Sequence, residues 1–126
     1  MDLTWSYSKA HKPSAPVVRA AIGNLSVELV VDSGFSGGVL LPFPHFQALG
    51  LMSRLVPEDF AAVLPDRRKV EAYTAMAQVT MGKASFSTLV HASPMIDKSL
   101  LGREALKAMD AKLDGPNEAL TFSMEA

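Results

Sequence analysis

The sequence predicts a small, mainly β domain with one or two short helices. Two pairs of strand-like segments, each joined by a glycine and a polar residue, are typical of β-hairpins. The other apolar runs are short and bounded by proline or glycine, and only two segments have the apolar spacing of a helix. A chain of 126 residues is long enough for one domain with one core. We therefore expect a single domain over residues 1–126, with its core at about 15–124.

The first hairpin is predicted in "APVVRAAIGNLSVELVV", where Gly23-Asn24 forms the turn. Both turn residues tolerate the positive φ angles of a tight hairpin. In the second strand, residues 25–29 alternate between apolar and polar, which indicates one buried face. The alternation stops at Val30-Val31, so the end of this strand is expected to be buried on both faces.

The remaining elements follow in order along the chain. A β-prone segment at 3–8 precedes the hairpin, and a short strand is predicted at 38–42. A helix is predicted at 44–51 because proline suits its first turn and glycine its C-terminal cap. We expect a helical turn or an irregular segment at 57–65. The later predictions are a second hairpin made of 68–82 and 84–93, a strand that becomes a helix within 99–114, and a last strand at 118–124.

Composition excludes several classes of function. The net charge is −1, so there is no overall field to attract nucleic acid or an anionic membrane. No apolar run is long enough to span a bilayer, and the polar N-terminus does not resemble a signal peptide, so we expect a cytoplasmic protein. There is no cysteine, and His11, His45 and His91 lack metal-ligand spacing. We expect no metal and no cofactor.

Asp32 raises a question, because a charge at the end of an apolar strand is costly. Taken alone, Asp32-Ser33-Gly34 is an ordinary turn sequence. Its surroundings are less ordinary, since an aromatic residue, two more glycines and another apolar strand follow it. A second element, Leu100-Leu101-Gly102-Arg103, comes about seventy residues later and opens a predicted helix.

The two motifs together resemble those of the retropepsin-like aspartic peptidases, especially the single-domain prokaryotic members. That family has two apolar residues before Asp-Thr/Ser-Gly, as in Val30–Gly37 here, and a later apolar-apolar-Gly, as in Leu100–Arg103. The resemblance covers roughly Ala15 to Asp114. It implies the small, closed, β-barrel-like acid protease fold.

The resemblance also implies an aspartic endopeptidase that hydrolyses peptide or protein substrates. Two aspartates share one proton; the ionised one activates a water molecule and the protonated one stabilises the oxyanion. Asp-Ser-Gly occurs only once in the sequence, so the second Asp32 must come from the partner in a homodimer.

By resemblance, the neighbouring residues support Asp32. The Ser33 hydroxyl would bond across the dimer axis to the partner backbone, and Gly34 would bring its N–H close to the carboxylate. Leu101 and Gly102 would pack under the turn. Arg103 would begin a helix, either paired with a carboxylate or as a solvated surface charge.

The sequence departs from the family pattern in two places. Pepsin-like members have a serine that hydrogen-bonds the carboxylate where this chain has Phe35, which cannot do so. The candidate flap over the substrate has its tip at Asp66, Arg67 and Arg68, without the glycines of retroviral flaps. Apolar side chains that we expect to contact substrate are Phe35, Val39, Leu64, Met95 and Ile96.

Two alternatives to a peptidase stay open. One is a catalytically inactive module with the same fold, used for dimerisation or peptide binding. The other is an unrelated β-rich domain in which Asp-Ser-Gly is only a turn.

Overall fold

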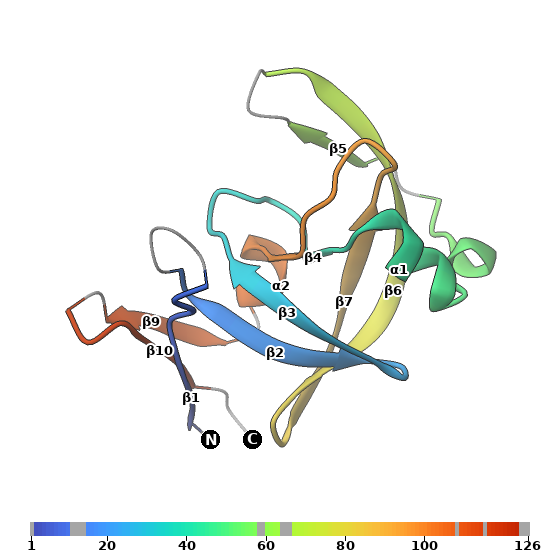
Figure 1. Cartoon of the computed structure of the whole chain (residues 1–126). Helices are drawn as coiled ribbons and strands as arrows, with labels where there is room; N and C mark the ends of the chain where they lie inside the picture. Colours follow the sequence, from blue (N-terminus) through green and yellow to red (C-terminus); the bar gives the residue numbers. More distant parts are fainter. Residues whose placement is uncertain are drawn as a thin grey trace.

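The computed structural model describes residues 2–10, 15–57, 60–63, 67–107, 109–114 and 116–123. These residues are mainly in strands, with short helices between them (Figure 1). The strands are β1 (Asp2–Ser6), β2 (Val17–Ile22), β3 (Leu25–Val31), β4 (Val39–Leu40), β5 (Phe60–Val63), β6 (Lys69–Met81), β7 (Ala84–Ala92), β8 (Leu100–Leu101), β9 (Asp110–Asp114) and β10 (Ala119–Ser123). The helices are α1 (Phe43–Ala48), the 3-10 helix η1 (Leu51–Arg54) and α2 (Arg103–Leu106).

Six strands close into a barrel, which confirms the predicted fold class. Their order is β2-β3-β8-β4-β7-β6, and β6 pairs back onto β2 through Ala21↔Thr80 and Ile22↔Val79. Both predicted hairpins are present, with Gly23 (φ 58°) and Gly82 (φ 60°) in the left-handed conformation that their turns require. Alternate residues of the long strands fill the barrel and form its core.

The short strand β8 is the centre of the arrangement around Asp32. It runs parallel to β3, with Val30 opposite Leu100 and Val31 opposite Leu101. It runs antiparallel to β4, where Val39 lies opposite Leu101. The two sequence motifs, far apart along the chain, therefore become neighbouring strands of one sheet.

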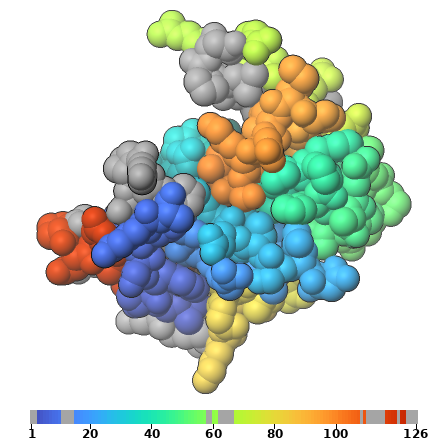
Figure 2. Space-filling view, in the orientation of Figure 1, coloured from blue at the N-terminus to red at the C-terminus, as the bar shows by residue number. Residues whose placement is uncertain are grey.

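A second sheet, of order β1-β10-β9, lies beside the barrel (Figure 1 and Figure 2). It joins the first strand of the chain to the last, both antiparallel to their neighbours. Trp5 of β1 packs edge-on against Phe122 of β10, with ring centroids 5.6 Å apart, and Phe122 is fully buried. Edge-on aromatic pairs of this kind add to the stabilisation that burial provides.

Two sequence predictions are wrong. Within 57–65, Phe60–Val63 is the strand β5 rather than a helical turn, because its backbone pairs with β6 over Phe60↔Ala72 to Val63↔Lys69. The predicted C-terminal helix is only the single turn α2, and Asp110–Asp114 is the strand β9, paired with β10. Tertiary pairing overrides the local helical spacing at both places.

Candidate active site

Asp32 lies at the end of β3, in a turn that orients its carboxylate. Its backbone N–H donates to the carbonyl oxygen of Leu101 at 2.9 Å, which extends the β3–β8 pairing by one residue. The N–H of Gly34 donates to Oδ1 of Asp32 at 2.8 Å, and that of Phe35 donates to the Asp32 carbonyl at 3.1 Å. The side chain is thus fixed by its own loop, in a half-buried position.

The second motif holds the loop that follows Asp32. Three consecutive N–H groups at the start of α2 donate to loop carbonyls: Gly102 to Gly38 at 2.7 Å, Arg103 to Phe35 at 2.8 Å, and Glu104 to Gly37 at 3.0 Å. A Cβ at position 102 would overlap the Gly37 carbonyl oxygen and the Phe35 ring, so only glycine allows this approach. The loop and α2 are therefore packed as one unit.

The turn itself is open to solvent. Ser33 and Gly34 are exposed, whereas Leu101 beneath them is fully buried. The Arg103 side chain is also exposed, and it forms no ion pair with any residue that the structure describes. A second molecule could therefore reach Ser33 and Gly34 without any rearrangement of the core.

Phe35 belongs to an aromatic cluster with Phe60 and His91. The Phe35 ring is edge-on to Phe60 at a centroid distance of 5.9 Å and to His91 at 6.0 Å. The rings of Phe60 and His91 are stacked at 3.7 Å. Apolar residues on neighbouring elements pack around Phe35 and Phe60, namely Leu40, Ile96 and Leu100.

His91 is a feature that the sequence analysis missed. It is 1% exposed, and burial lowers its pKa to about 4. Its Nδ1 is hydrogen-bonded to the Thr74 hydroxyl at 2.8 Å, whereas its buried Nε2 has no partner among the described residues. The signal available in the sequence was a histidine inside the apolar run Leu89–Ala92.

The candidate flap is a hairpin that projects beyond the barrel on the same side as the loop after β3 (Figure 1). Arg67 and Arg68 lie exposed just before β6, and Asp66 lies outside the described residues. Arg67 has φ 68°, so a non-glycine residue here takes the left-handed conformation usual for glycine.

The expected substrate-contacting side chains have different positions. Val39 is fully buried in the barrel core, so the expectation that it contacts substrate is wrong. Ile96 packs with Phe35, and Met95 is 64% exposed. Leu64 lies outside the described residues.

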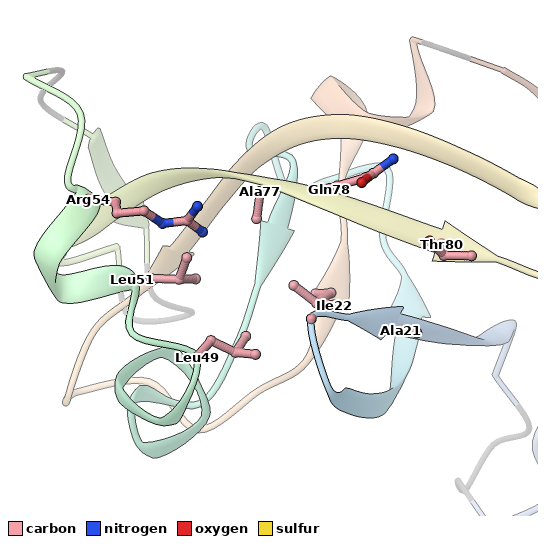
Figure 3. Close-up of a pocket in the computed structure, with 9 residues that line it drawn as sticks. Ala21, Ile22, Leu49, Leu51, Arg54, Ala77, Gln78 and Thr80 are labelled. Carbon is pink, nitrogen blue, oxygen red and sulfur yellow. The ribbon is translucent and has the colours of Figure 1, made fainter.

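A separate hollow of about 340 Å³ lies at the other end of β3 (Figure 3). Arg54 and Gln78 lie at its rim, above an apolar floor that includes Ile22 and Leu51. None of the described residues that line it is acidic, and its position beside the Gly23 turn is remote from Asp32. It is therefore not the candidate active site.

Comparisons with known proteins identify the fold. No protein-family model matches the sequence, and no curated protein matches it. A crystal structure of a retropepsin-like aspartic protease from Rickettsia conorii matches with a TM-score of 0.69 and 19% identity, covering 97% of this chain and 90% of that one. The retroviral protease-like domain of Ddi1 from Leishmania major matches with a TM-score of 0.60 and 20% identity, covering 86% and 88% respectively. The chain has the retropepsin-like fold.

Two further findings concern the described part of the chain only. It contains no helix long and apolar enough to cross a membrane. Nor does it bring together three or more histidine or acidic side chains that could hold a metal ion.

Proposed function

We propose that residues 1–126 form one domain of an aspartic endopeptidase that acts as a homodimer. The observation that carries this proposal is the Asp32 turn, in which the Gly34 N–H orients the carboxylate and the N–H groups at the start of α2 donate to carbonyl oxygens of the loop. Orientation of this kind reduces the reorganisation that a catalytic group needs during the reaction. The two structural neighbours support the proposal at the level of fold.

In the proposed mechanism, Asp32 of each protomer faces the dimer axis. Two carboxyl groups held close together share one proton, because two like charges at short distance are costly. The ionised carboxylate removes a proton from a water molecule, which attacks the scissile carbonyl carbon. The protonated carboxyl donates a hydrogen bond to the carbonyl oxygen and stabilises the negative charge that develops there.

The dimer is part of the proposal because the sequence contains Asp-Ser-Gly only once. The exposed positions of Ser33 and Gly34 leave the turn accessible to a second copy. In a two-fold dimer the same turn meets itself, and each Ser33 hydroxyl would reach the partner backbone. A site assembled in this way is incomplete in the monomer.

The hairpin of β5 and β6 is the proposed cover over the substrate. It carries Arg67 and Arg68 near its end, so an extended peptide with acidic side chains would gain favourable electrostatic contacts there. The alternative function is an inactive dimerisation or peptide-binding module. It is favoured by Arg67, which takes a left-handed conformation without being glycine. A side chain at such a position makes the hairpin stiffer than glycine would.

The proposal is tested by cleavage of a mixed peptide library between pH 3.5 and 7. Wild type is compared with Asp32→Asn, which keeps the side-chain shape but cannot ionise. Asp97→Asn is the matched control, because Asp97 is an exposed aspartate outside the turn. We expect cleavage by wild type and Asp97→Asn, and none by Asp32→Asn. Equal cleavage by all three proteins would refute the role of Asp32, and no cleavage by a confirmed wild-type dimer would favour the binding module.

A further inference from the structure

The ring of His91 contacts separate parts of the candidate site. One face is stacked on Phe60 of β5, and Phe35 of the Asp32 loop approaches edge-on. Its Nδ1 is hydrogen-bonded to the Thr74 hydroxyl of β6, the strand that forms the hairpin with β5. The strand β7 that carries His91 is paired with both β6 and β4. His91 thus connects the loop of Asp32 to the base of the proposed cover.

The contact with the loop is tight. A Cβ built on Gly37 would lie 2.6 Å from Cδ2 and 2.7 Å from Nε2 of His91, which is closer than real Cβ atoms come. Gly37 therefore packs its backbone directly against this edge of the ring. Any movement of the ring would be transmitted to the loop, because interiors are close-packed.

A neutral ring suits these surroundings and a charged ring does not. In either neutral tautomer, Nδ1 can bond to the Thr74 hydroxyl. Protonation makes both ring nitrogens donors, and Nε2 is buried with no acceptor among the described residues. An unpaired buried donor on a charged group is strongly unfavourable.

The residues described against the ring offer no compensating charge. They include Thr74 of β6, Phe60 of β5, and Phe35 and Gly37 of the loop, and the register partner of His91 on β4 is Leu40. The only carboxylate of this loop is Asp32, five residues before Gly37, whose Oδ1 accepts from Gly34. Asp59 precedes Phe60 in sequence and lies outside the described residues.

We propose that His91 is a positioning residue that seats the β5–β6 hairpin on the Asp32 loop, and that the hairpin stays seated only while the ring is uncharged. Protonation moves the ring toward solvent, which separates Phe60 from Phe35 and loosens the contact at Gly37. The effect on catalysis rests on the proposed peptidase function, whereas the effect on the hairpin does not. Acid would therefore open the proposed cover.

The test is NMR spectroscopy of Asp32→Asn between pH 7 and 3, because the loop of this variant contains no carboxylate. We expect the His91 ring to titrate with a midpoint of about 4. Nuclear Overhauser contacts between the Phe35 and Phe60 rings should disappear at the same midpoint. The contact between Trp5 and Phe122, in the other sheet, should persist and shows that the fold is intact.

The matched protein is the double variant Asp32→Asn with His91→Phe, which keeps a ring on Phe60 but cannot be charged. Its Phe35–Phe60 contacts should persist throughout the titration. The proposal is overturned if these contacts survive protonation of His91, or if they are lost equally in the double variant. Simultaneous loss of the Trp5–Phe122 contact would also contradict it, because the charge would then act on the whole fold.

Activity supplies an independent readout in proteins that retain Asp32. Wild-type kcat/KM should fall about tenfold per pH unit below the His91 midpoint, and His91→Phe should lack this component of the acid limb. If wild type cleaves nothing at any pH, the proposed function fails, and the NMR contacts alone decide the role of His91.

Discussion

Replacing His91 should change how the stability of the protein depends on pH. Burial lowers the pKa of His91 from 6.5 to about 4, so the unfolded chain binds a proton more readily than the folded protein. The contribution of His91 to the free energy of unfolding is therefore fully present above pH 6.5 and is lost as the pH falls toward 4. Below pH 4 this contribution changes no further. Each pKa unit corresponds to about 1.4 kcal/mol, so the difference between 6.5 and about 4 makes the loss about 3.5 kcal/mol at most.

The assay is urea unfolding of wild type and His91→Phe at a series of pH values, at one fixed protein concentration. The single tryptophan, Trp5, packs on buried Phe122 and reports loss of tertiary structure by fluorescence. Near pH 7.5 the variant should be less stable by about 1 kcal/mol, because Thr74 loses its hydrogen bond to Nδ1. Between pH 6.5 and 4 the difference in unfolding free energy should shift by about 3 kcal/mol in favour of the variant.

Acidic side chains are the same in wild type and in His91→Phe, so their effects cancel. The difference between the unfolding free energies of the two proteins therefore isolates His91. Thr80→Val is the control, because it removes a hydroxyl from the same strand β6 at a distance from the cluster, and it should follow the wild-type pH dependence. A difference between wild type and His91→Phe that does not vary with pH would refute the reasoning. It would mean that the folded protein accommodates the charged ring.

Three further predictions concern the support of the site and the surface. Gly102→Ala should displace the Asp32 loop and increase the amide exchange rates of the α2 donors about tenfold or more. Gly50→Ala is the control, because a Cβ at position 50 meets no atom within 4 Å. It should lower the free energy of unfolding by about 1 to 2 kcal/mol, the cost of a left-handed alanine, and leave the α2 amides unchanged. Leu101→Ala, at a fully buried position, should lower the free energy of unfolding by about 2 to 5 kcal/mol in urea titrations, and a loss below 1 kcal/mol would show that the cavity collapses. Arg19→Ala should cost less than about 1 kcal/mol in the same assay, because its 2.8 Å ion pair with Glu28 is exposed; a larger loss would mean that the arginine stem packs on the barrel.

The strands could be predicted where local sequence and tertiary pairing agree. Gly23 and Gly82 mark hairpin turns, and alternation along residues 25–29 marks the face that fills the barrel. The prediction failed at Phe60–Val63 and at Asp110–Asp114, because the strand state of each depends on antiparallel pairing with the next strand, β6 or β10, which the composition of the segment itself does not reveal.

The site could be predicted only in part for a similar reason. The Asp32 turn and the motif around Gly102 are contiguous in sequence, so each is visible as a pattern, and the β3–β8 pairing brings them together. The cluster of Phe35, Phe60 and His91 joins three segments without a shared motif. Such contacts arise from the barrel topology, and no local signal predicts them.

The measurement that tests the central claim most directly is the activity of mixed dimers. Wild-type and Asp32→Asn proteins would be mixed in varying ratios, allowed to exchange subunits, and assayed on a peptide that wild type cleaves. If each site needs Asp32 from both protomers, activity at fixed total protein should follow the square of the wild-type fraction and fall to about a quarter in an equal mixture. A linear decrease, with about half of the activity left in the equal mixture, would show that one chain suffices and would contradict the shared site.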